Sequence, residues 1–139
     1  LVDIGAHAVL SRLDWQVVLD AFSPSLLSEM FIGVGPSSGL DLVSFAPGAG
    51  DDTSGIGSYS GTLDLTGLGV GAGADGLLRI EFFDAFKDFG AGVAEGQWLR
   101  GSLTLDVGTV PEPGSAALAA LGLAALAMHA RRRQRSLGR

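Results

Sequence analysis

The chain contains no cysteine and only two histidines, His7 and His129, among its 139 residues. The absence of cysteine excludes disulfide bonds, thiolate metal sites and a cysteine nucleophile. Two histidines are too few for a zinc site built from imidazole ligands. Basic residues are also scarce, since nine Lys and Arg face 15 Asp and Glu, giving a formal charge of -6. We expect no cofactor and no nucleic-acid partner, because phosphate recognition requires clustered Lys and Arg.

The charges are divided along the chain rather than mixed. Residues 1–113 contain four basic residues and all 15 acidic ones, a formal charge of -11, whereas residues 114–139 contain five arginines and no acid, a formal charge of +5. An apolar stretch lies where the two charge regimes meet. This asymmetry indicates two environments separated by a membrane.

The first ten residues include Asp3 and His7 but no Lys or Arg. A secretory signal peptide begins with a positively charged region, so this stretch does not have that pattern. We therefore expect a processed or truncated amino terminus.

Alternation of apolar and polar residues predicts about six strands between residues 7 and 107. It is clearest in residues 97–107, where it places Leu99 and Leu103 on an inner face and Trp98 and Arg100 on a polar face. Turns rich in glycine and aspartate separate the strands. Residues 1–108 are therefore predicted to form an all-β domain, an antiparallel, jelly-roll-like β-sandwich. The expected strands are 13–20, 30–34, 40–45, 58–66, 77–82 and 97–107.

Two segments within this region have helical rather than strand features. Ser23 and Pro24 precede an apolar pair in the manner of a helix start, which predicts one turn of helix. Phe82, Phe86 and Phe89 are spaced as on one helix face, which predicts a short helix after the 77–82 strand.

The sheet pattern ends at Pro111 and Pro113, because proline cannot donate to a strand ladder. Residues 109–113 are thus a linker. Residues 114–130 contain no formal charge, eight alanines and four leucines, and as a helix they would span about 25 Å, slightly less than a hydrocarbon core. We predict one transmembrane helix there, with residues 131–139 as a cytoplasmic tail. Four arginines are expected to orient and stop the helix at its cytoplasmic side: Arg131, Arg132, Arg133 and Arg135.

Two glycine motifs resemble sites for chemistry but lack the required context. Residues 35–39 match G-x-S-x-G, yet the only histidine downstream is His129 in the apolar segment. Residues 71–76 match G-x-G-x-x-G, but a strand-like sequence follows where a nucleotide site needs a helix. Ordinary turns explain both motifs better.

Acidic residues in the predicted loops could bind calcium, which prefers oxygen ligands. Residues 70–75 resemble one copy of a calcium-binding G-G-x-G-x-D repeat, with Val70 in place of the first glycine, but a single copy cannot stack into a solenoid. The acids have no fixed ligand spacing, so we favour solvated loop acids over a metal site. The residues concerned are Asp41, Asp51, Asp52 and Asp75.

Aromatic residues could provide a platform on which a sugar ring stacks. Trp98 is the best candidate, because the alternation places it on the polar face of its strand, ahead of Trp15 and Tyr59. Aromatic residues at alternating strand positions more often pack in the core, which is the interpretation we favour.

The end of the chain resembles the PEP-CTERM sorting signal of Gram-negative bacteria. The resemblance covers about 26 residues and rests on three features in order: the motif Val110, Pro111, Glu112 and Pro113, the apolar residues 114–130, and the terminal arginine cluster. It implies secretion, retention in the inner membrane by the tail, and processing by an exosortase, a membrane protease that acts near the motif. It also implies association with exopolysaccharide and biofilm.

We therefore expect a non-enzymatic protein of the cell envelope, secreted to the cell surface or extracellular matrix after exosortase processing. Its expected partners are the exosortase, the lipid bilayer of the inner membrane and exopolysaccharide. The alternative is a permanently anchored periplasmic module that binds carbohydrate or calcium.

Overall fold

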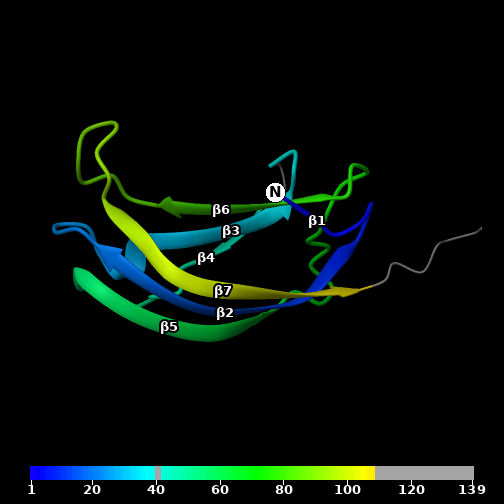
Figure 1. The fold of residues 1–139 in the computed structure, drawn as a ribbon, viewed down its shortest axis with the longest axis horizontal. Helices are drawn as coiled ribbons and strands as arrows, with labels where there is room; N and C mark the ends of the chain where they lie inside the picture. The colour runs from blue at the N-terminus through cyan, green and yellow to red at the C-terminus, as the bar shows by residue number, and fades with distance from the viewer. Residues whose placement is uncertain (40–41, 109–139) are drawn as a thin grey trace, which may run out of the picture. The chain divides into compact units, whose positions relative to one another are not determined.

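The computed structural model describes residues 1–39 and 42–108, and these form seven strands and one short 3-10 turn (Figure 1). Contacts divide the chain into two units, the first of which spans Leu1–Thr109. All strand pairs are antiparallel, which confirms the all-β prediction. The elements are β1 Val2–Asp3, β2 Val9–Ala21, η1 Leu27–Glu29, β3 Met30–Pro36, β4 Val43–Phe45, β5 Gly55–Asp64, β6 Leu77–Asp84 and β7 Gly96–Gly108.

The strands form two sheets that lie one over the other. The first has the order β1-β6-β3-β4 and the second the order β5-β2-β7, and Figure 1 shows them as an upper and a lower layer. The main core cluster takes residues from both layers, including Leu13 of β2 and Ile32 of β3, which are fully buried. A jelly roll has eight strands, whereas the described residues form sheets of four and three.

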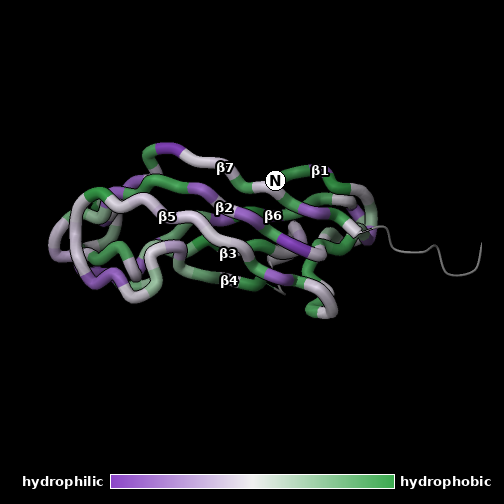
Figure 2. The backbone as a smooth tube through the Cα atoms, turned by 90° about the horizontal axis from the view of Figure 1, so that it is seen from below, coloured by the Kyte–Doolittle hydropathy of each residue, from purple (hydrophilic) through white to green (hydrophobic). Residues whose placement is uncertain are grey.

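Apolar and polar residues alternate along the central strand β2, so its inner face packs against the other sheet. Leu13, Val17 and Leu19 are buried on its inner face, and burial along β5 alternates at every residue. Figure 2 shows both hydrophobic and hydrophilic segments along β2, whereas β5 is mostly pale. Gly61 of β5 lies opposite Trp15 of β2. A Cβ at this glycine would collide with the indole ring, so the glycine makes room for the aromatic side chain.

All six predicted strands are present, with residues 40–41 of one of them outside the described residues. The additional strand, β1, contains two residues and pairs through Val2 with Leu78 and through Asp3 with Leu77. So short a strand has no detectable alternation, which explains why the sequence did not predict it.

The helical predictions have different outcomes. The turn of helix expected after Pro24 is η1, where the amide of Leu26 donates to the Glu29 carboxylate at 2.9 Å. The helix expected over Phe82, Phe86 and Phe89 is wrong. Strand β6 continues through residue 84 because it remains paired with β3, and the Asp84 carboxylate then accepts the amide of Phe86 at 3.0 Å, which forms a turn.

Within residues 1–39 and 42–108, no helix has the length and apolar character needed to cross a membrane. The transmembrane helix predicted at 114–130 lies outside the described residues, as do the linker and the arginine tail.

Candidate functional site

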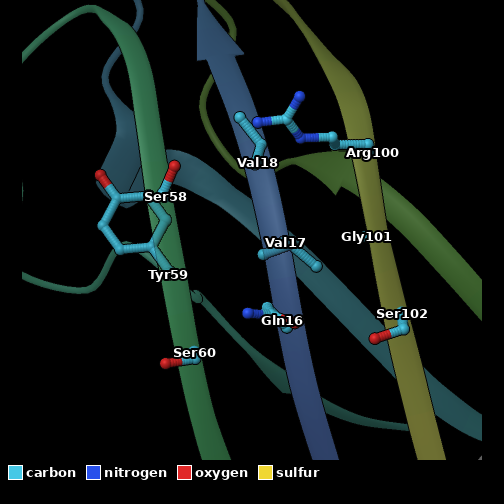
Figure 3. Close-up of a pocket in the computed structure, with 9 residues that line it drawn as sticks. All are labelled: Gln16, Val17, Val18, Ser58, Tyr59, Ser60, Arg100, Gly101 and Ser102. Carbon is cyan, nitrogen blue, oxygen red and sulfur yellow. The ribbon is translucent and has the colours of Figure 1, made fainter.

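The outward face of the β5-β2-β7 sheet contains a shallow groove of about 500 Å³ (Figure 3). The strand registers place polar side chains in rows across the three strands. One row joins Ser60, Gln16 and Ser102, and the next row contains Ser58 and Arg100 on either side of Val18. Hydroxyl, amide and guanidinium groups on an open surface can donate and accept hydrogen bonds to a polar polymer. The groove is lined by Gln16, Val17, Val18, Ser58, Tyr59, Ser60, Arg100, Gly101 and Ser102.

The expectation that Trp98 lies on the polar face of its strand is wrong. Leu19 pairs with Trp98 whereas Val18 pairs with Arg100, so Leu99 is an extra residue that forms a bulge in β7. The bulge reverses the alternation, and Trp98 packs against both core clusters with its ring 4.7 Å from that of Phe82. Leu99 is 44% exposed instead of facing inward. Trp98 is therefore a core residue and not an exposed sugar platform.

The other two aromatic candidates also pack inward, as favoured from the sequence. The Trp15 ring lies 4.5 Å from that of Phe45 between the sheets. The Tyr59 hydroxyl donates to the Asp51 carboxylate at 2.6 Å. Partial burial, followed by this hydrogen bond, raises the pKa of Tyr59 to about 12. The hydrogen bonds from Tyr59 and Thr53 lower the pKa of Asp51.

The acidic loop residues are held separately by neighbouring donors. The Asp52 carboxylate accepts the Ser28 hydroxyl at 2.8 Å, and the Asp75 carboxylate accepts the amide of Leu77 at 3.1 Å as well as the Ser37 hydroxyl. Asp41 lies outside the described residues. In the part of the chain that the structure describes, no three Asp, Glu or His side chains come close enough to share a metal ion.

Both glycine motifs lie in turns. Residues 35–39 end β3, and the chain continues toward strand β4 rather than into a helix. Residues 71–76 precede strand β6, and Gly76 adopts a φ of 75°, a conformation that favours glycine. The contexts required for a nucleophile elbow and for a nucleotide loop are therefore absent from these two segments.

A buried carboxylate that no sequence pattern indicates supports the loop between β6 and β7. Glu95 is only 3% exposed, and its carboxylate accepts the Lys87 ammonium at 2.7 Å and the amide of Phe89 at 2.8 Å. These two hydrogen bonds lower the pKa of Glu95. The hydrogen bond with Glu95 in turn raises the pKa of Lys87. Because the partners come from one glycine-rich loop, no regular spacing marks them in the sequence.

We predict that Glu95→Gln lowers the thermal midpoint of residues 1–108 by about 5–10 °C at neutral pH, because a buried charged acceptor is lost. The Glu95 pKa is lowered from its ordinary value of 4.5, so its contribution is present above pH 4.5 and is lost as the pH falls through the folded-state pKa. Thermal melts followed by circular dichroism over this pH range should therefore show that acidification lowers the thermal midpoint less in the variant than in the wild type.

Glu81→Gln is the matched control, since Glu81 pairs with Arg79 at the surface and both side chains are about one third exposed. Surface pairs contribute little to stability. If the two variants melted at the same temperature, the structural role assigned to Glu95 would be refuted.

One comparison with known protein families concerns the carboxy-terminal tail. Residues 109–133 match the family model of the PEP-CTERM protein-sorting motif. The tail is a PEP-CTERM sorting motif. A search of curated proteins and a search of solved structures both found no match to the chain.

The PEP-CTERM match contains most of the predicted site residues. Val110, Pro111, Glu112 and Pro113 lie within it. It also contains Arg131, Arg132 and Arg133, whereas Arg135 lies two residues beyond its end. All of these residues are outside the described part of the chain, so their individual roles stay predictions.

Proposed function

We propose that the chain is a non-enzymatic protein of the cell envelope that its PEP-CTERM motif delivers to an exosortase. The observation that carries the proposal is the family match at residues 109–133. An exosortase that cleaves near Pro111, Glu112 and Pro113 would separate residues 1–108 from the tail. The released domain would then reside at the cell surface or in the extracellular matrix.

In the proposed precursor, residues 114–130 cross the inner membrane and the arginines remain in the cytoplasm, as the positive-inside rule favours. Residues 1–108 would be extracytoplasmic. The composition supports this arrangement, because the acidic residues all precede the apolar segment and five arginines follow Ala130.

We further propose that the domain associates with exopolysaccharide through the groove on the β5-β2-β7 sheet. The row of Ser60, Gln16 and Ser102 presents two hydroxyls and an amide across three strands, and such groups form hydrogen bonds with sugar hydroxyls. The same groove supports the alternative, a permanently anchored periplasmic module that binds carbohydrate. The two proposals differ in whether the tail is removed.

Cell fractionation tests the proposal. In a host with a cognate exosortase, the wild-type protein should be recovered from the cell surface or medium. In the same host without the enzyme, it should remain in the inner membrane. Recovery from the inner membrane in both hosts would refute exosortase processing and leave the permanent anchor.

The arginine cluster gives a separate prediction about topology. A 17-residue segment with four leucines inserts marginally and relies on flanking positive charge. Changing the four arginines to glutamine should misorient or release a fraction on the order of a tenth or more. Protease accessibility of residues 1–108 in spheroplasts and in inverted vesicles measures this fraction, and Arg139→Gln is the control. Unchanged topology would show that the apolar run suffices. The four changes are Arg131→Gln, Arg132→Gln, Arg133→Gln and Arg135→Gln.

A further inference from the structure

Strand β7 has an open edge. It is the last strand in the order β5-β2-β7, it contains 13 residues, and within residues 1–39 and 42–108 no strand pairs with its outer side. A long edge presents a row of backbone donors and acceptors that can pair with another chain. Beside this edge lies an opening of about 350 Å³, lined by Val17, Phe82, Trp98, Gly101 and Leu103 together with the polar residues Arg100 and Ser102.

The middle of β7 is regular, and its two charges lie at the ends of the regular part. Register shifts occur at Leu99 and opposite Ser11, so Arg100–Asp106 pairs with β2 without interruption. Arg100 and Asp106 are the only charged residues of the strand, and neither belongs to an ion pair among the described residues. Arg12, which lies across from Asp106, donates instead to Asp14 at 2.8 Å.

We propose that β7 is an interface for a second copy of this chain, which pairs antiparallel with it about a two-fold axis at Leu103. Residues equally far from Leu103 then face each other. Arg100 of each copy meets Asp106 of the other at both ends of the regular segment, and opposite charges directly across two strands stabilise the pair. The two β5-β2-β7 sheets join into one continuous sheet.

The remaining side chains fit the same register. Leu105 of one copy lies opposite Gly101 of the other, where the glycine leaves room beside this opening. Leu103 lies opposite Leu103 of the second copy. Just outside the two ends of the regular segment, the apolar residues Leu99 and Val107 are 44% and 43% exposed in the single chain. Other two-fold registers that keep the inner faces together leave Arg100 opposite an uncharged residue or opposite Arg100 of the other copy, which repels it.

Strand β5, the opposite edge of the same sheet, lacks this complementarity. Its ten residues contain one charge, Asp64, and no basic residue. Two copies paired through β5 would therefore gain no ion pair in any register. The charge pattern selects β7 as the edge at which copies associate.

Because the chain has no cysteine, disulfide trapping can determine the register. Ser102 lies opposite Thr104 of the second copy, so a mixture of Ser102→Cys and Thr104→Cys full-length chains in detergent micelles should form a cross-linked heterodimer under mild oxidation. Each variant alone should cross-link about tenfold more slowly, since its own cysteines lie about 7–8 Å apart on the diagonal. Both positions are exposed, so folding should be unaffected.

Leu103→Cys should cross-link to itself, and Ser60→Cys on β5 is the control that should not. Equal cross-linking in all samples, or none in the mixture, would overturn the proposal. Association driven by the apolar tail would produce equal cross-linking in all samples, because it does not select a register of β7.

Charge reversal provides an independent test by sedimentation equilibrium of the full chain. Arg100→Asp and Asp106→Arg should each weaken dimerisation about tenfold, because each converts two attractive pairs into two repulsive ones. The double variant should regain wild-type affinity within about threefold, since the charges are then exchanged. Unchanged association in the single variants, or no recovery in the double variant, would refute the β7 pairing.

Discussion

Replacing Pro111, Glu112 and Pro113 with alanine should abolish processing and cause the full-length protein to accumulate in the inner membrane. Two prolines fix φ, remove two backbone donors and favour extended preceding residues, so we expect this segment to stay out of helix interiors and central strands. Alanine is the strongest helix former and would allow the apolar helix to extend toward the domain. A membrane protease would then lose its extended substrate, while the apolar run and the arginines would still hold the protein in the membrane.

Gel mobility and membrane fractionation in a host with a cognate exosortase measure this effect, which should be close to all-or-none. The matched control places three alanines outside the motif match, at Gln134, Ser136 and Leu137, and should be processed like the wild type. Processing of the triple-alanine protein at the wild-type rate would show that Pro-Glu-Pro is not the recognised element.

Trp98→Ala should destabilise residues 1–108 by about 3 kcal/mol, whereas Leu99→Ala should cost about 0.5 kcal/mol or less. The bulge in β7 turns the indole into the space between the sheets, where it contacts both core clusters and the ring of Phe82. Leu99 is exposed beside it. Urea unfolding followed by circular dichroism compares the two variants directly.

The regular alternation of residues 97–107 predicts the reverse order, with Leu99 inside and Trp98 outside. Equal losses in the two variants, or a larger loss for Leu99→Ala, would therefore contradict the bulge. Trp98→Phe is a useful third variant, because it keeps an aromatic ring beside Phe82 and should lose less stability than Trp98→Ala.

The strands could be predicted because each is a local alternation of apolar and polar residues. The bulge could not, because it arises where β7 must match the register of β2, and that register depends on residues about 80 positions away in the chain. Adjacent large apolar residues, Trp98 and Leu99, were the available sign that the alternation breaks. The spacing of the phenylalanines from Phe82 to Phe89 led to a wrong helix prediction for a related reason, because the pairing of β6 with β3 overrides the local pattern.

The candidate sites also differ in whether the sequence alone could identify them. The sorting motif is contiguous, so its residues could be identified from the sequence, and the family match agrees with that identification. The groove requires Ser60, Gln16 and Ser102 to meet across three strands, and the Glu95 site depends on how one loop folds back on Lys87. Both depend on tertiary register, which alternation alone does not determine.

Exosortase processing is tested most directly by the intact mass of the wild-type protein from two otherwise identical hosts, one with a cognate exosortase and one from which the exosortase gene is deleted. If an exosortase processes the tail, the protein from the first host ends near Pro111, Glu112 and Pro113, and the protein from the second host still ends at Arg139. A protein that ends at Arg139 in both hosts would contradict exosortase processing and make the tail a permanent anchor.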